Sequence, residues 1–278
     1  MYTYVNGEII KNEDVRISPY DHGFLYGIGV FETFRTYNGQ PFLLDEHLVR
    51  LNESLRELNI DLQLNRSTVE KMLTMLFEAN GWENAYIRLN VSAGNSEIGL
   101  QTAPYRNPNI IAFQKPLAES ESLVEKKGEW LTLRRNSPEG RYRLKSHHYL
   151  NNIFGKREVG NDPKVEGIFL TKNGDVAEGV VSNIFWTQQN TLYTPALETG
   201  ILDGVTRQFV MKIAQEAGMN VEEGLYRPEH VYAAHEAFVT NSIQEIVPLS
   251  ALGNKMFPGA EGAAVNKLFR RYREAVRL

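Results

Sequence analysis

The sequence predicts two mixed α/β domains of the α+β type, and three observations lead to this prediction. The 278 residues suit two modest domains better than one, because a single hydrophobic core rarely grows to that size. Apolar residues change along the chain between a period of two, typical of strands, and a helical period. The stretch 114–122 is polar, contains Pro116 and lacks apolar periodicity, so we place an interdomain linker there. The expected domains are a smaller one at 1–113 and a larger one at 123–278.

In the first domain a hairpin and two amphipathic helices are expected first. Residues 27–31 lead into a β-rich segment at 33–37, which is followed at 38–39 by an Asn-Gly pair typical of hairpin turns. Asp45 is the expected N-cap of a helix whose apolar face carries Leu48, Leu51, Leu55 and Leu58. Residues 67–70 resemble a capping box for a second helix, which should end at Gly81. Its apolar side carries Val69, Met72, Leu73, Leu76 and Phe77.

Two strands should complete this domain, at 85–91 and 109–113. The first alternates strictly, so one set of side chains should face the core and the other the opposite side of the sheet. The core set is Ile87, Leu89 and Val91, and the opposite set is Tyr86, Arg88 and Asn90. We expect the second set to face a pocket.

The second domain should be mainly β at its centre. Strands are expected at 130–134 and 167–171, with a helix at 150–159 between them. A long β pattern covers 176–187. After Gly204 an amphipathic helix should begin and end at Gly218.

Composition limits the classes of partner. Thirty basic and 34 acidic residues give a net charge of −4 without a block of one sign, which argues against a nucleic-acid surface. The absence of cysteine excludes disulfides and thiolate metal sites, and six histidines alone do not suggest a metal centre. The sequence shows no secretory signal and no apolar run of membrane-spanning length. We therefore expect a cytoplasmic protein that binds a small molecule.

The pair most informative for function is Lys145 and, 33 positions later, Glu178. A pyridoxal phosphate enzyme needs an amine that forms a Schiff base and a carboxylate that keeps the pyridinium nitrogen protonated. Together with the segment 21–35, these residues resemble the fold type IV pyridoxal phosphate enzymes nearly from end to end. That family includes branched-chain aminotransferases, D-amino acid aminotransferases and aminodeoxychorismate lyases. The segment 21–35 most resembles the lyases of Bacillus-like bacteria.

The resemblance implies the aminotransferase fold of type IV, with pyridoxal 5'-phosphate bound between two domains. It implies that Lys145 forms the Schiff base and later transfers protons, while Glu178 binds the pyridine nitrogen and Tyr149 the phenolic oxygen. The phosphate would be bound by Arg50, Val205, Thr206 and Ser242. Main-chain N–H groups at a helix start and a paired arginine donor both suit a phosphate.

The residues alone leave structural alternatives open for each of these roles. Lys145 could belong to a basic loop, Glu178 to an exposed edge strand, and Thr206 to an ordinary helix cap. Arg50 could be a surface residue of its helix, and Tyr149 a core residue.

The reaction depends on residues around the substrate. The lyases resemble this chain in carrying Thr33 where the branched-chain enzymes have glycine, and a hydroxyl there could assist proton transfer or bind the leaving fragment. Phe31 replaces the pocket tyrosine of the D-amino acid enzymes, and 92–100 lacks their carboxylate-binding arginine and histidine. Arg88 is the main candidate for binding a substrate carboxylate, followed by Arg35 and Arg143. An ion pair of Arg88 with Glu32 is the alternative.

These observations predict a homodimeric lyase that converts 4-amino-4-deoxychorismate into 4-aminobenzoate and pyruvate for folate synthesis. Dimerisation is implied by the resemblance alone. The nearest alternative is an aminotransferase of the same fold acting on branched-chain or D-amino acids. A third alternative is a two-domain binding protein without catalysis.

Overall fold

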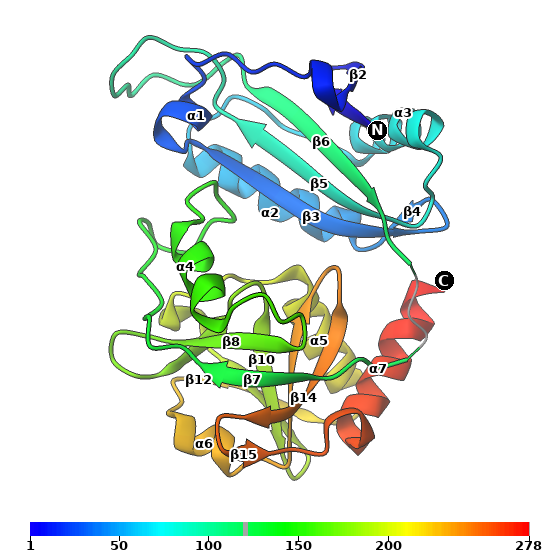
Figure 1. Cartoon of the computed structure of the whole chain (residues 1–278), viewed down its shortest axis with the longest axis vertical. Coiled ribbons are helices and arrows are strands. Elements are labelled where there is room, and N and C mark those ends of the chain that lie inside the picture. Colours follow the sequence, from blue (N-terminus) through cyan, green and yellow to red (C-terminus); the bar gives the residue numbers. More distant parts are fainter. Residues whose placement is uncertain (119–121, 278) are drawn as a thin grey trace. The chain divides into compact units, whose positions relative to one another are not determined.

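The computed structural model describes residues 1–118 and 122–277 (Figure 1). It divides into two compact units, Met1–Glu119 with Leu144–His148, and Ser120–Arg143 with Tyr149–Leu278. The short segment around Lys145 therefore belongs to the first unit. The expected division into 1–113 and 123–278 placed this segment in the second domain. Residues 114–116 of the expected linker form the end of strand β6, and 119–121 lie outside the described residues. The two-domain division itself stays a prediction.

The first unit is built on a six-stranded antiparallel sheet in the order β2-β1-β6-β5-β3-β4. Its strands are β1 (Tyr2–Val5), β2 (Glu8–Lys11), β3 (Gly29–Tyr37), β4 (Gln40–Pro41), β5 (Ala85–Ser92) and β6 (Asn109–Pro116). The helices are η1 (Asn12–Asp14), α1 (His22–Tyr26), α2 (Leu44–Glu57) and α3 (Arg66–Asn80). The core forms where the apolar stripes of α2 and α3 meet one face of the sheet.

The predicted alternation of β5 is confirmed. Ile87, Leu89 and Val91 are buried in the core, and Arg88 and its neighbours on the other face are half-buried. The hairpin of β3 and β4 is also confirmed, with left-handed backbone at its Asn-Gly turn. Because β3 alternates too, Phe31 lies on the face of Arg88.

Both predicted helix starts were wrong by two residues. Leu43 precedes α2 as its N-cap, and the Asp45 carboxylate is bound by Arg66 instead. Asn65 caps α3 by accepting a hydrogen bond from the Thr68 main chain. The buried faces of both helices match the predicted apolar stripes, since packing responds to the whole pattern rather than to one cap.

The second unit contains a nine-stranded mixed sheet in the order β12-β11-β10-β13-β14-β7-β8-β9, with β15 paired to β14. Its strands are β7 (Lys126–Trp130), β8 (Val165–Leu170), β9 (Val176–Gly179), β10 (Asn183–Gln188), β11 (Thr191–Pro195), β12 (Asn220–Gly224), β13 (Glu236–Asn241), β14 (Glu245–Leu252) and β15 (Lys255–Met256). The helices are α4 (Leu150–Val159), η2 (Leu197–Thr199), α5 (Val205–Glu216), α6 (Pro228–Tyr232), η3 (Gly259–Glu261) and α7 (Ala263–Val276).

Two strand predictions in this unit need correction. The strand expected at 130–134 lies earlier, as β7, because the carboxylate of Glu158 takes the main-chain N–H groups of Thr132 and Leu133. The long pattern at 176–187 is two strands, interrupted where Gly179 bonds across a turn to Ser182. The helix expected at 150–159 is confirmed at both ends.

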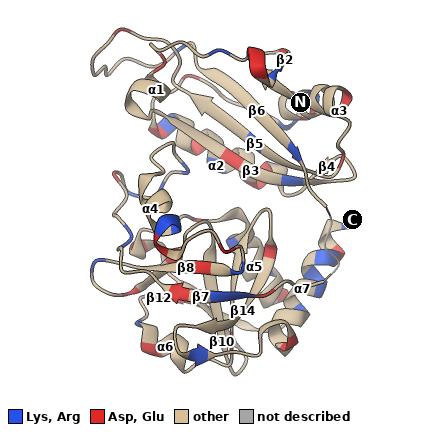
Figure 2. Cartoon of the chain, in the orientation of Figure 1, with Lys and Arg blue, Asp and Glu red and all other residues tan. Residues whose placement is uncertain are grey.

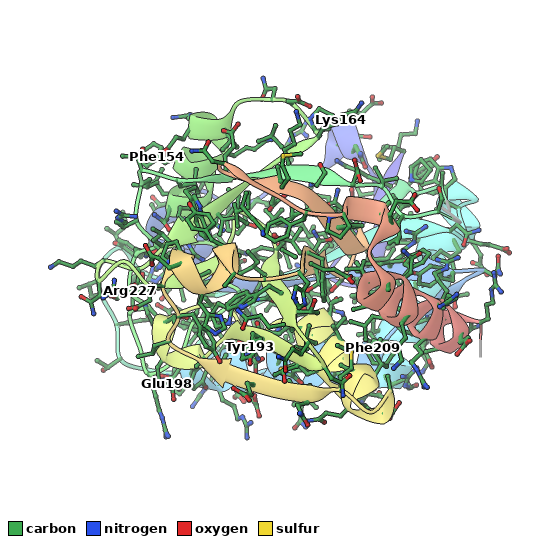
Figure 3. The ribbon with its side chains drawn as sticks, turned by 90° about the horizontal axis from the view of Figure 1, so that it is seen from below. Phe154, Lys164, Tyr193, Glu198, Phe209 and Arg227 are labelled. Carbon is green, nitrogen blue, oxygen red and sulfur yellow. The ribbon has the colours of Figure 1, made fainter. Side chains whose placement is uncertain are left out.

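Aromatic side chains pack against one another in the second unit (Figure 3). Tyr193 of β11 stacks on Trp186, and Phe209 of α5 meets Tyr272 of α7 edge to face. Charges of both signs are spread over the elements of each unit (Figure 2). Within the described ranges, no helix has both the length and the apolar character needed to cross a membrane.

Candidate active site

The main chain fixes the segment of Lys145 against strand β3. The Phe31 N–H donates to the Lys145 carbonyl at 2.8 Å, and the His147 N–H donates to the Gly29 carbonyl at 2.9 Å. A Cβ atom at Gly29 would lie 2.4 Å from the His147 ring, so only glycine allows this close approach. The Lys145 ammonium nitrogen lies 4.7 Å from the centroid of the Phe31 ring. The segment of Lys145 and strand β3, more than a hundred residues apart in the sequence, thus meet at the side chain of Phe31.

Arg88 lies over the same ring. Its guanidinium carbon is 3.6 Å from the Phe31 centroid, which is a cation–π contact, and its Nε donates to the side chain of Asn90 at 3.1 Å. Thr33 is the direct partner of Arg88 in the β3–β5 ladder. Among residues 1–118 and 122–277 no carboxylate pairs with Arg88. The alternative in which Arg88 pairs with Glu32 is therefore wrong.

Glu32 faces α2 instead, where it forms a buried cluster with Arg50 and His47. Arg50 donates to both Glu32 oxygens, at 2.8 and 2.6 Å, and His47 lies 2.6 Å from one of them. Burial would raise the pKa of the Glu32 carboxyl, but Arg50 and His47 outweigh it and hold this pKa at about 2. Burial also lowers the pKa of His47, against the attraction of Glu32. Arg50 is thus not a surface residue of its helix, and its side chain is only 14% exposed.

Arg35 is a weaker candidate for binding substrate. Its side chain is buried, its Nη2 donates to the Ala118 carbonyl at 2.8 Å, and its guanidinium lies 4.7 Å from the Tyr37 ring. These contacts give Arg35 a structural role, and its role toward substrate stays a prediction.

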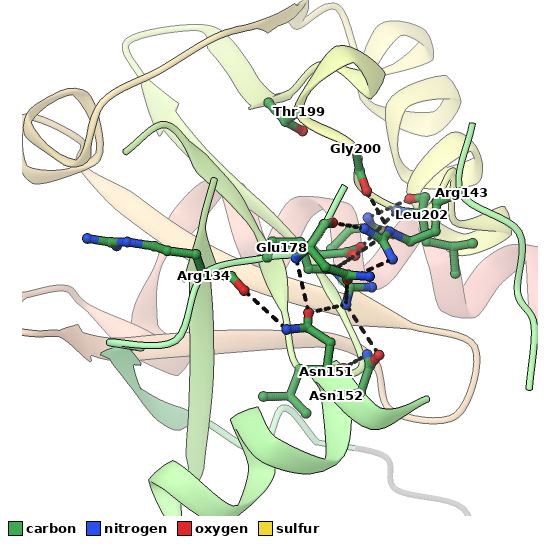
Figure 4. Close-up of polar contacts among 12 residues, drawn as sticks. Arg134, Arg143, Asn151, Asn152, Glu178, Thr199, Gly200 and Leu202 are labelled. Atoms are coloured by element: carbon green, nitrogen blue, oxygen red, sulfur yellow. Dashed lines mark hydrogen bonds and ion pairs between the residues drawn. The ribbon is translucent and has the colours of Figure 1, made fainter. Parts of the chain in front are cut away.

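In the second unit, Glu178 is buried on β9 with partners on both carboxylate oxygens (Figure 4). The Arg135 Nε donates to Oε1 at 2.8 Å, and the Leu202 main chain donates to Oε2 at 3.0 Å. The Arg143 Nε lies 3.8 Å from Oε1. Burial is the main cause that lowers the pKa of Arg143 to about 10, and repulsion from Arg135 is the second. Although β9 is at the edge of the sheet, the Glu178 side chain is buried rather than exposed, and two arginines lie beside its carboxylate.

Sequence reasoning missed Arg135. Asn151 and Asn152, at the start of α4, accept hydrogen bonds from its Nη1 at 2.7 and 3.3 Å (Figure 4). Asn152 also donates to the Val180 carbonyl, two residues after Glu178. The two asparagines thus orient the guanidinium that binds the carboxylate. The only signal in the sequence was a pair of adjacent arginines at 134–135, which does not tell which one is buried.

The three predicted phosphate ligands of the second unit lie together. Val205 and Thr206 begin α5, whose N-cap, Gly204, makes no side-chain capping bond. The Thr206 hydroxyl lies 3.2 Å from the hydroxyl of Ser242. The first N–H groups of a helix have no partner within it, and they carry the positive end of the helix dipole. Two hydroxyls beside an uncapped helix start are a donor set that fits a phosphate.

Tyr149 is half-buried directly before α4, and its carbonyl accepts the first hydrogen bond of that helix from Ile153. Each unit therefore carries part of the predicted set. The first holds Lys145, Thr33, Phe31, Arg88, Arg35 and Arg50, and the second holds Glu178, Tyr149, Val205, Thr206 and Ser242. A carboxylate held among cations, a lysine on an aromatic ring and a cluster of phosphate donors fit the chemical groups of pyridoxal phosphate.

Known enzymes are similar to this chain over nearly its whole length. An aminodeoxychorismate lyase of Bacillus subtilis is 46% identical over 99% of this chain and 94% of the relative. A D-alanine aminotransferase of Bacillus licheniformis is 30% identical over 94% of this chain and 92% of the relative.

Solved structures of similar fold include both kinds of enzyme. A branched-chain amino acid aminotransferase of Escherichia coli matches with a TM-score of 0.88 and 25% identity, covering 98% of this chain and 93% of the other. A 4-amino-4-deoxychorismate lyase of Pseudomonas aeruginosa matches with a TM-score of 0.86 and 26% identity, covering 98% of both chains. A family model described as amino-transferase class IV matches residues 29–252. The cofactor of that family is pyridoxal phosphate, as predicted. The chain is an enzyme that belongs to the amino-transferase class IV family.

Proposed function

We propose that this enzyme is a lyase that converts 4-amino-4-deoxychorismate into 4-aminobenzoate and pyruvate, a step that supplies folate synthesis. The observation that carries the proposal is the convergence of Lys145, Phe31 and Arg88, with Thr33 beside Arg88 in the sheet. The 46% identity with the Bacillus subtilis lyase, against 32% and 30% with two aminotransferase relatives, supports the same reaction.

Arg88 would bind a carboxylate of the substrate, which carries two. A guanidinium offers paired donors that match a carboxylate. The Nε of Arg88 is already bonded to Asn90, and the Phe31 ring supports its plane. Because no protein carboxylate neutralises Arg88 in the described chain, its charge is available for an anionic ligand.

Lys145 would act as the base. When bound, pyridoxal phosphate supplies an electron sink for the charge left as a proton departs. We propose that the Lys145 amine removes the proton from the ring carbon that bears the substrate nitrogen. The enolpyruvyl group then leaves with its electron pair and takes up a proton to become pyruvate, while the ring becomes aromatic. Thr33 would bind the leaving fragment or assist this proton transfer.

The remaining candidates would bind the cofactor. Glu178, whose carboxylate accepts a hydrogen bond from Arg135, suits the pyridine nitrogen, and Tyr149 would bind the phenolic oxygen. The phosphate would be bound by Arg50, Val205, Thr206 and Ser242. We also propose a homodimer in the cytoplasm, which light scattering and cell fractionation would test.

The reaction can be tested with purified enzyme and 4-amino-4-deoxychorismate. We expect equal amounts of pyruvate and 4-aminobenzoate without any added amino acceptor. Turnover that occurs only with a keto acid would reject the lyase and support an aminotransferase, the activity named for several relatives. Failure of borohydride to trap any cofactor–lysine adduct would instead support a binding protein without catalysis.

A further inference from the structure

A buried ion pair contacts the turn that carries Ser242. Lys126 of β7 and Glu166 of β8 pair at 3.0 Å, with side chains 10% and 5% exposed. The Lys126 ammonium also donates to the side chain of Gln244, two residues after Ser242, at 3.1 Å. On the other side, Ser182 donates to the second Glu166 oxygen at 2.8 Å.

Within the turn, local hydrogen bonds fix the backbone around Ser242. The Asn241 side-chain oxygen accepts from the main chains of Ile243 and Gln244, at 3.0 and 2.8 Å. The side-chain nitrogen of Asn241 donates to Gln244, the same oxygen that Lys126 binds. Gln244 therefore connects the turn to the buried ion pair.

The end of the turn is strained. Glu245 adopts a left-handed backbone with φ of +63°, and its buried carboxylate is paired with Arg273 of α7 at 2.8 Å. Such a conformation in a residue other than glycine costs of order 1–3 kcal/mol and persists only where the surroundings impose it. Buried ion pairs are also poor sources of net stability compared with apolar residues of similar size. One such pair includes Glu245 and the other contacts the turn through Gln244, which suits a role in fixing the shape of the turn rather than in adding stability.

We propose that Lys126, Glu166 and Gln244 are positioning residues that hold the Asn241–Glu245 turn so that Ser242 meets Thr206 at the phosphate. The proposal rests on the proposed cofactor role of Ser242. The 3.2 Å separation of the Thr206 and Ser242 hydroxyls requires a turn of defined shape, because Ser242 lies between two strands and Thr206 on a helix. Without the Lys126–Gln244 contact, the Gln244 side chain would no longer connect the turn to the ion pair of β7 and β8.

The test compares two ligands of the apoenzyme, pyridoxal phosphate and pyridoxal, which lacks the phosphate. Gln244→Leu removes the contact and leaves the buried ion pair intact. We expect it to raise the dissociation constant of pyridoxal phosphate roughly tenfold, the effect of about one hydrogen bond, and that of pyridoxal less than about twofold. Gln215→Leu, the same change on the exposed side of α5, is the control and should alter neither value.

Two further variants separate the possible failures. Ser242→Ala should show the same phosphate-specific loss, and the double variant with Gln244→Leu should lose no more than Ser242→Ala alone, since Gln244 acts through Ser242. If Ser242→Ala weakens pyridoxal phosphate selectively and Gln244→Leu does not, the positioning role is wrong and the cofactor site stands. If Ser242→Ala has no selective effect, the phosphate assignment of Ser242 is wrong and the inference falls with it. Lys126→Met combined with Glu166→Gln removes both buried charges together and should reproduce the selective loss, whereas equal weakening of both ligands would overturn the proposal.

Discussion

Replacing Arg88 by methionine tests the proposed substrate site most directly. Methionine keeps an unbranched apolar stem and removes the guanidinium that lies over Phe31. We expect the protein to fold and to bind pyridoxal phosphate as before, because Arg88 pairs with no carboxylate in the described chain. The proposed reaction should slow, because a substrate carboxylate would lose its cationic partner.

The size of the effect follows from the hydrogen bonds that Arg88 can offer. Its Nε is bonded to Asn90, which leaves the two terminal nitrogens to bind a carboxylate. Hydrogen bonds to charged groups contribute about 1.5–3 kcal/mol each, and the side chain is only half-buried, so water weakens the pair. We expect a loss of about 3 kcal/mol, which corresponds to roughly a 150-fold decrease in kcat/KM. Arg88→Lys keeps the charge without the paired donors and should lose about tenfold.

Steady-state release of pyruvate, measured over a range of substrate concentrations, provides the assay. Arg106→Met is the matched control, because Arg106 is an exposed arginine of the same unit. Loss of the contact with Phe31 should lower the free energy of unfolding by only about 0.5–1 kcal/mol. An unchanged kcat/KM in a folded Arg88→Met enzyme would show that Arg88 does not bind substrate. An equal loss in Arg106→Met would show that general charge, rather than this site, attracts the anion.

Three other changes test the cluster on α2 and the chemistry at Lys145. Glu32→Gln should destabilise the enzyme by about 3 kcal/mol at pH 7, because the Glu32 pKa is lowered from 4.5 to about 2. A carboxyl group whose pKa is lowered on folding stabilises the fold at pH values above its pKa in the unfolded chain. Urea titrations should therefore show that the difference in unfolding free energy between the two proteins shrinks as the pH falls from about 4.5 toward 2. A difference that does not change with pH would refute the ion pair. Lys145→Ala should abolish the borohydride-reducible adduct, and a persistent adduct would assign the Schiff base to another lysine. Thr33→Gly should reduce lyase turnover more than affinity for pyridoxal phosphate, and unchanged turnover would remove Thr33 from the mechanism.

Patterns that repeat along the chain predicted the fold well. The alternation of β5, the apolar faces of α2 and α3, and the limits of α4 were all confirmed. These features depend on many residues acting together, so a single exception does not disturb them. Features that depend on one side chain were less predictable. Asp45 resembled an N-cap, yet its carboxylate accepts hydrogen bonds from Arg66, 21 residues later.

Contacts between distant segments explain what the sequence could not predict about the candidate site. Nothing local indicates that 144–148 pairs with β3, since the pairing depends on Gly29 leaving room for His147. Likewise, the resemblance gave Glu178 only the pyridine nitrogen of the cofactor as a partner. The structure adds Arg135, which two asparagines of α4 orient. Such partners become visible only when the strands and helices have been brought together.

Arg135, Arg273 and Arg88 differ in the partners of their guanidinium groups. Arg135 and Arg273 are buried against Glu178 and Glu245, and removing either partner would leave a costly buried charge. Arg88 differs, because an aromatic ring and a neutral amide fix its position without neutralising it. An arginine held in place this way keeps its charge for an anion and loses little side-chain entropy when the anion binds. On this reasoning, Asn90→Asp would place a carboxylate 3.1 Å from Arg88 and should weaken the substrate, raising KM while leaving the affinity for pyridoxal phosphate unchanged. An unaltered KM would show that the charge of Arg88 is not used by the substrate.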